Sequence, residues 1–197
     1  MNYPTYVIID NERFDINTDF RYALKCEQIA NDETINNFER GLALIYTLFG
    51  EKGINSQDKY EKLLETAKKW LLCGKELNER NGNEDMDFIE DYDYIEASFM
   101  SDYHIDLSNT KMHWWKFFKL LCGLSNSEMG DCCILNRVRN LRNYDVSKIK
   151  DANEREKISK AKQEVALHKK TIEATDEQLE NALKLYEELG IKIEKEG

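Results

Sequence analysis

The sequence predicts a mainly α-helical protein with a small β-hairpin at its N-terminus, and three observations lead to this prediction. The only proline among the 197 residues is Pro4, so no later residue lacks the backbone donor that a helix needs. Apolar residues recur at steps of three and four along most of the chain. Hydrophobic residues make up 41% of the chain, which suffices for a packed core and argues against global disorder. We therefore expect a domain of about five helices over residues 1–150 and a charged helical arm over residues 151–197.

The hairpin is predicted between residues 3 and 16. The segment 6–9, Tyr-Val-Ile-Ile, is apolar and mostly β-branched, and the segment 10–12, Asp-Asn-Glu, supplies turn residues. Phe14 and Ile16 then alternate with polar neighbours, as expected for a strand with one buried face.

Helical segments follow, each with apolar residues along one side. They are expected near residues 18–29, 32–49, 56–73, 87–103, 110–122 and 125–141. Gly50, Gly74 and Gly123 stand where three of these segments should end. The residues expected to be largely buried on these helical stripes are Trp70, Phe88, Ile95, Phe99, Phe117 and Leu121.

The C-terminal arm has few apolar residues in its first half. Residues 151–170 are rich in lysine and glutamate, so a helix there buries little surface by itself. A last helix, capped near Thr175, carries an apolar side that needs another chain to cover it. The candidate partner-binding residues are those of this side and the two adjacent tryptophans of the domain: Leu179, Leu183, Tyr186, Leu189, Trp114 and Trp115.

The net charge of −10 is concentrated in one segment. No lysine or arginine lies between Arg80 and Lys111, and this gap holds nine acidic residues, which leaves 38 − 9 = 29 acids against 28 bases elsewhere. Such a charge argues against non-specific binding to nucleic acid or to an anionic membrane. The chain also lacks an apolar run of about 18 residues and a secretory signal at its start. We therefore expect an intracellular protein without a membrane span.

Residues that could bind a metal do not fall into a binding pattern. The five cysteines include the adjacent pair Cys132 and Cys133, which lacks the spacing of a zinc-chelating pair, and free thiols in a reducing cytosol account for them better. Acidic residues between Asp85 and Glu96 match part of a calcium loop, but Glu90 stands where that loop needs glycine. We expect no metal and no cofactor.

Catalysis and binding to nucleic acid are also not expected. Cys122 and His113 are nine residues apart, which turns a thiol and its base to different sides of one helix. Trp114 and Trp115 lie beside lysines and could stack on bases, but the acidic balance of the chain opposes this. The sequence therefore favours a non-catalytic protein that binds other proteins.

Three blocks of sequence resemble a known family. The segment 16–21 follows the hairpin, the aromatic segment 94–103 leads into Ile-Asp-Leu at 105–107, and His-Trp-Trp-Lys-Phe follows at 113–117. In this order they resemble siphophage proteins that are encoded in the tail module near the tape measure gene and are similar in size and genomic role to tail assembly chaperones. The resemblance covers residues 5–170, and it departs at His104, where the family pattern has glycine.

The resemblance implies a role in phage tail assembly in the cytoplasm of the host cell. A protein of this kind binds the tape measure protein and the tail tube protein, is not an enzyme, and is absent from the mature virion. We expect it to be a homo-oligomer. The alternative is an acidic phage-encoded inhibitor that imitates nucleic acid and binds a host DNA-binding protein. That alternative requires carboxylates spread over one exposed surface at roughly the spacing of phosphates, about 7 Å along a strand.

Overall fold

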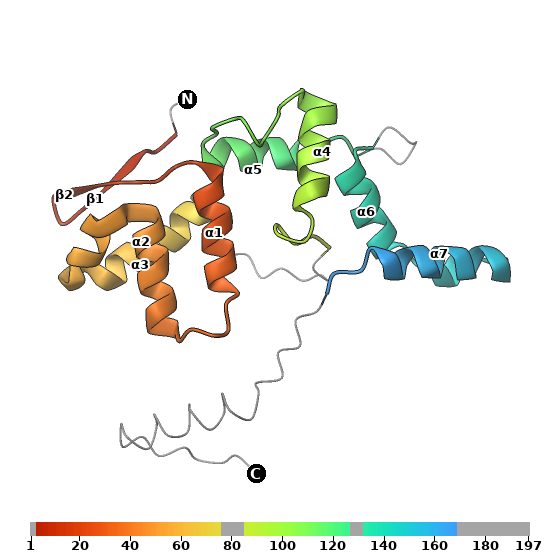
Figure 1. The fold of residues 1–197 in the computed structure, drawn as a ribbon, viewed down its shortest axis with the longest axis horizontal. Coiled ribbons are helices and arrows are strands. Elements are labelled where there is room, and N and C mark those ends of the chain that lie inside the picture. Colours follow the sequence, from red (N-terminus) through yellow and green to blue (C-terminus); the bar gives the residue numbers. More distant parts are fainter. Residues whose placement is uncertain (1–2, 76–84, 127–131, 169–197) are drawn as a thin grey trace, which may run out of the picture. The chain divides into compact units, whose positions relative to one another are not determined.

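The computed structural model describes residues 3–75, 85–126 and 132–168, and over these residues seven α-helices follow a two-stranded antiparallel hairpin (Figure 1). The prediction of a mainly helical chain with an N-terminal hairpin is confirmed. The strands and helices are β1 (Tyr6–Ile9), β2 (Glu12–Asp15), α1 (Phe20–Ala30), α2 (Asn37–Asn55), α3 (Tyr60–Leu71), α4 (Tyr92–Tyr103), α5 (Trp114–Cys122), α6 (Ile134–Asn143) and α7 (Ala152–Glu164), with short 3-10 turns at Gln57–Lys59 and Val146–Lys148.

The chain divides into a compact unit of residues 1–167 and a second unit of residues 168–197. Helix α7 therefore groups with the first unit, although the domain boundary is predicted before it, at residue 150. The last predicted helix, with its four partner-binding residues, lies outside the described residues, and the autonomy of residues 1–150 stays a prediction.

The hairpin turns through two residues in the left-handed region, Asp10 with a φ of 51° and Asn11 with a φ of 62°. Asparagine and aspartate tolerate this region better than other side chains, which explains the tight two-residue turn. The two strands bury Ile9 and Phe14 against the helices, and β2 packs on α2. Tyr6 and Ile8 lie on the other face and are exposed.

The bounds of α2 and α6 differ from the predicted ones. Helix α2 begins at Asn37, later than predicted, because the side chains of Asn36 and Glu39 form a reciprocal capping box. Gly50 interrupts α2 with a φ of 67°, but the helix resumes and continues to Asn55. Helix α6 begins at Ile134 and not near residue 125.

A stack of aromatic rings joins α1, α4 and α5. The ring centroid of Phe117 lies 4.6 Å from that of Phe20 and 5.1 Å from that of Phe99, with nearly parallel planes. Offset stacking of this kind adds to the stabilisation from burial alone. Five of the six residues expected in the core are buried, and the sixth, Phe88, is partly buried against the ring of Trp114.

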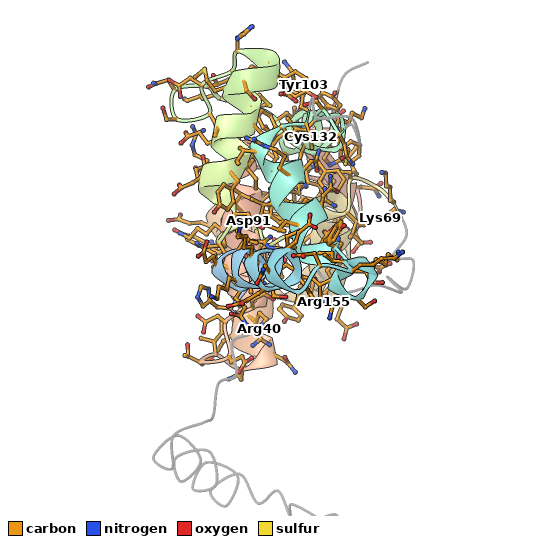
Figure 2. All side chains as sticks on the ribbon, turned by 90° about the vertical axis from the view of Figure 1, so that its right-hand side faces the viewer. Arg40, Lys69, Asp91, Tyr103, Cys132 and Arg155 are labelled. Atoms are coloured by element: carbon orange, nitrogen blue, oxygen red, sulfur yellow. The ribbon has the colours of Figure 1, made fainter. Side chains whose placement is uncertain are left out.

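Helices α4, α6 and α7 meet at a buried ion pair, close to Asp91 in Figure 2. Arg142 of α6 donates to both carboxylate oxygens of Asp91 at 2.7 Å, and the Asp91 side chain is 0% exposed. Arg142 also donates to the carbonyl oxygens of Asp85 and Val165. The paired carboxylate of Asp91 raises the pKa of Arg142 above its usual value. One side chain therefore ties the start of α4 to the end of α7.

Candidate functional site

The side chains of the two adjacent tryptophans, Trp114 and Trp115, form hydrogen bonds inside the domain. The indole Nε1 of Trp114 donates to the carbonyl oxygen of Leu71 at 2.8 Å, and that of Trp115 donates to the carbonyl oxygen of Trp70 at 2.9 Å. Both indoles therefore donate to carbonyls at the end of α3, where the carbonyl of Trp70 also accepts from the backbone N–H of Cys73. Trp114 is buried and Trp115 is half-buried, and a role of either residue in partner binding stays a prediction.

His113 has a structural role at the start of α5. Its Nδ1 accepts a hydrogen bond from the backbone N–H of Trp115 at 3.0 Å, and its Nε2 lies 3.0 Å from the carbonyl oxygen of Pro4. This arrangement fits the neutral tautomer with the proton on Nε2. Both ring nitrogens are thus engaged, which leaves neither to act as a base for the exposed thiol of Cys122.

The segment 16–21, the first block of the family resemblance, holds the chain that leads into α5. The guanidinium of Arg21 donates to the carbonyl oxygens of Leu107, Ser108 and Thr110, while Asp19 accepts from the backbone N–H of Met112. The backbone N–H of Trp114, the first residue of α5, also donates to the carbonyl oxygen of Thr18. These contacts set the position of α5 against α1.

His104, where the resemblance leads us to expect glycine, ends α4 in the left-handed conformation with a φ of 53° and a ψ of 36°. Glycine adopts this conformation at no steric cost, so the structure explains why it is the expected residue there. Histidine keeps the turn geometry and bears the strain.

The acidic segment is largely occupied by internal contacts in the described residues. Asp91 binds Arg142 of α6, and Asp85 binds Arg139 of the same helix. Both acids belong to the segment that partly matches a calcium loop in sequence. Further carboxylates cap turns or accept backbone donors: Asp87 from Ile89 and Glu90, Asp102 from Ser125, and Asp106 from Ser108. These hydrogen bonds fix the orientation of the exposed carboxylates but do not remove their charge.

No three histidine, cysteine, aspartate or glutamate side chains are grouped to hold a metal ion in the part of the chain that the structure describes. No helix within those same residues is long and apolar enough to cross a membrane.

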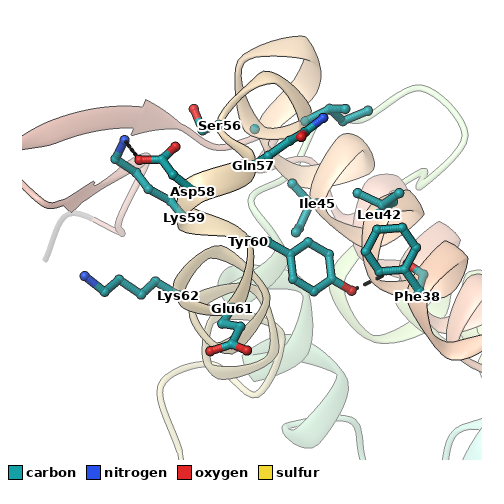
Figure 3. Close-up of a pocket in the computed structure, with 12 residues that line it drawn as sticks. Phe38, Leu42, Ile45, Ser56, Gln57, Asp58, Lys59, Tyr60, Glu61 and Lys62 are labelled. Carbon is teal, nitrogen blue, oxygen red and sulfur yellow. Dashed lines mark hydrogen bonds and ion pairs between the residues drawn. The ribbon is translucent and has the colours of Figure 1, made fainter.

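A groove of about 650 Å³ opens between α2 and the start of α3 (Figure 3). Its apolar side comes from α2, where Phe38 is 60% exposed, Leu42 is partly exposed, and Ile45 is buried. Its other side is the polar turn and first residues of α3. The lining residues are Phe38, Leu42, Ile45, Gly53, Ile54, Ser56, Gln57, Asp58, Lys59, Tyr60, Glu61 and Lys62.

Gly41 determines how closely the two sides of the groove approach. A Cβ atom at this position would lie 2.0 Å from the hydroxyl oxygen of Tyr60, so only glycine lets Tyr60 rest on α2. The hydroxyl of Tyr60 donates to the carbonyl oxygen of Phe38 at 3.5 Å, and the two rings lie 5.3 Å apart. Phe38 remains 60% exposed beside this aromatic contact.

The rim of the groove is charged and held by ion pairs. Lys59 contacts Asp58 at 3.0 Å and Glu12 at 3.3 Å, and these carboxylates raise its pKa above the usual value. Lys62 binds Asp10 at the hairpin turn. An apolar centre with a polar rim is the usual composition of a protein–protein interface. Phe38 and Leu42 lie at helical spacing in the predicted helix of residues 32–49, but the sequence does not show the groove, because its other side comes from a different helix.

The chain is a bacteriophage protein. Residues 3–167 match the family described as Bacteriophage Gp15 protein, and the chain belongs to that family. This match covers nearly the same residues as the resemblance drawn from the three sequence blocks. No curated protein and no solved structure matches the chain.

Proposed function

We propose that this protein is a non-catalytic tail assembly chaperone, which binds the tape measure protein and tail tube subunits in the host cytoplasm and is absent from the mature virion. Its membership of a phage protein family supports a role in the phage life cycle. The observation that carries the proposal is the groove between α2 and α3, where Phe38 presents an open ring beside a charged rim.

The groove suits an amphipathic helix of the tape measure protein. Such a helix would place two or three apolar side chains, spaced by three or four residues, against Phe38 and Leu42. The chain's net charge of −10 would attract a helix with basic residues on its flanks. Each contact of this size is weak, so several copies bound along one long tape measure protein would supply the avidity that keeps it soluble.

The test compares two substitutions on one helix. Phe38→Asp places a charge in the groove, whereas Tyr46→Asp changes an aromatic residue of α2 that is 52% exposed and does not line the groove. We expect Phe38→Asp to weaken binding to helical segments of the tape measure protein by at least about tenfold, and Tyr46→Asp to leave it nearly unchanged. Fluorescence anisotropy of labelled segments measures both.

The proposal would be wrong if no segment of the tape measure protein bound the native chain. Equal effects of the two substitutions would place the binding surface away from the groove. Circular dichroism of both variants serves as the control for folding, and both side chains are exposed enough for a charge to be tolerated.

A further inference from the structure

The outer edge of β1 has backbone groups that β2 does not use. The carbonyl oxygen of Thr5 accepts from the N–H of Ile16 at 2.9 Å, which fixes the alternation of hydrogen-bonded pairs in the hairpin. Val7 and Ile9 accordingly direct their backbone polar groups towards β2. Tyr6 and Ile8 direct theirs away from it, and no hydrogen bond joins those groups to another described residue.

The β1 edge lacks the devices that usually prevent pairing. Edge strands are commonly protected by charged side chains, proline or bulges, and the segment 5–9 contains none of these. Its solvent-facing side chains are Tyr6, which is 44% exposed beneath the guanidinium of Arg13, and Ile8, which is 65% exposed. The edge of β2 differs, because Lys52 of α2 donates to the carbonyl oxygen of Arg13.

We propose that the β1 edge is a homodimer interface, in which β1 pairs antiparallel with β1 of a second copy about a two-fold axis at Val7. In this register Tyr6 of each copy faces Ile8 of the other. Those are the residues whose backbone donors and acceptors point outward, so the pairing makes four new hydrogen bonds. The same pairing sets each tyrosine ring beside an isoleucine side chain, which is a stabilising cross-strand pair.

The charges at the two ends of β1 favour a second copy in this orientation. The antiparallel register sets Asp10 of each copy beside Pro4 of the other, near the Tyr3 ring that Lys119 approaches to 4.9 Å. A parallel register would instead set the two Asp10 carboxylates side by side. Asp10 is already paired with Lys62, so no uncompensated charge enters the interface. This inference does not depend on the proposed binding of the tape measure protein.

The test uses the full chain and sedimentation from about 10 µM to about 1 mM, because a contact of this size is expected to be weak. Ile8→Pro removes an outward N–H without removing a hydrogen bond to β2, and Ile8→Lys adds a charge at the edge. We expect either substitution to weaken the dimer at least about tenfold. The control is Met100→Lys, which adds the same single charge at an exposed apolar residue of α4, outside the hairpin.

Amide hydrogen exchange supplies a second measurement at the edge itself. The amides of Tyr6 and Ile8 should exchange more slowly as the concentration of the chain rises. The control variant should show the same dependence on concentration, and the two Ile8 variants should lose it. A chain that stays monomeric throughout the range would overturn the proposal, as would a dimer insensitive to both Ile8 variants. Protection of these amides only after a different protein is added would show that the edge serves another partner.

Discussion

The buried pair of Arg142 and Asp91 gives the most demanding prediction about stability. Arg142→Met keeps much of the side-chain volume but removes both 2.7 Å hydrogen bonds to a carboxylate that is 0% exposed. A buried charge that loses its partner typically costs about 3–5 kcal/mol. For a protein of this size, a loss of about 3–5 kcal/mol lowers the melting temperature by roughly 10 °C.

The assay is urea unfolding of the full chain, followed by circular dichroism, with two further variants. Adding Asp91→Asn to Arg142→Met should restore part of the loss, because the buried side chain at position 91 then carries no charge. Lys160→Met on α7 removes an exposed ion pair with Glu156 and should change the free energy of unfolding by less than about 0.5 kcal/mol. A cost of Arg142→Met no larger than that of Lys160→Met would contradict this prediction. So would a double variant whose loss of stability equals the sum of the losses of Arg142→Met and Asp91→Asn.

Four further outcomes follow from the fold. Phe99→Ala should cost about 3–5 kcal/mol in urea unfolding, because its ring is fully buried in the aromatic stack; a cost below about 1 kcal/mol would contradict that packing. His104→Gly should raise the free energy of unfolding by up to about 1 kcal/mol, since glycine relieves the left-handed strain, and a loss would refute this. The backbone N–H of Ser125 lowers the pKa of Asp102, so the stability from this contact is present above the ordinary carboxyl pKa and is lost as the pH falls through the lowered value. Asp102→Asn should therefore reduce the pH dependence of the free energy of unfolding between pH 5 and about pH 2, measured by urea unfolding. Burial raises the pKa of Cys26 to about 12, so thiol reagents at neutral pH should label exposed Cys122 first and Cys26 only on unfolding, which mass spectrometry can check.

The helical period predicts which residues face the interior but not which neighbour they meet. The helical spacing of apolar residues predicts that Phe99 of α4 and Phe117 of α5 face the interior, and both are buried. Phe38 follows the same spacing on α2, yet it is exposed, because the start of α3 covers only part of that side. Helix α2 carries apolar residues on more than one side, which is a sign in the sequence that one of its faces has to remain open or meet a partner.

Local capping patterns are available in the sequence, whereas distant contacts are not. The asparagine and glutamate at 36 and 39 have the spacing of a capping box and would have given the start of α2. The pairing of Asp91 with Arg142 joins residues 51 apart in sequence, and charge alone does not select one arginine among several. The groove similarly depends on Gly41 lying opposite Tyr60, which only the packing of α2 on α3 establishes.

All three tryptophans of the chain lie at the junction of α3 and α5. Trp70 belongs to the last turn of α3, and Trp114 and Trp115 donate to carbonyl oxygens of that turn. The intrinsic fluorescence of the protein is therefore an optical probe of one location. Helix α3 begins at the groove and ends at these indoles. A change in tryptophan emission on binding would therefore show that occupation of the groove alters the structure at the far end of α3.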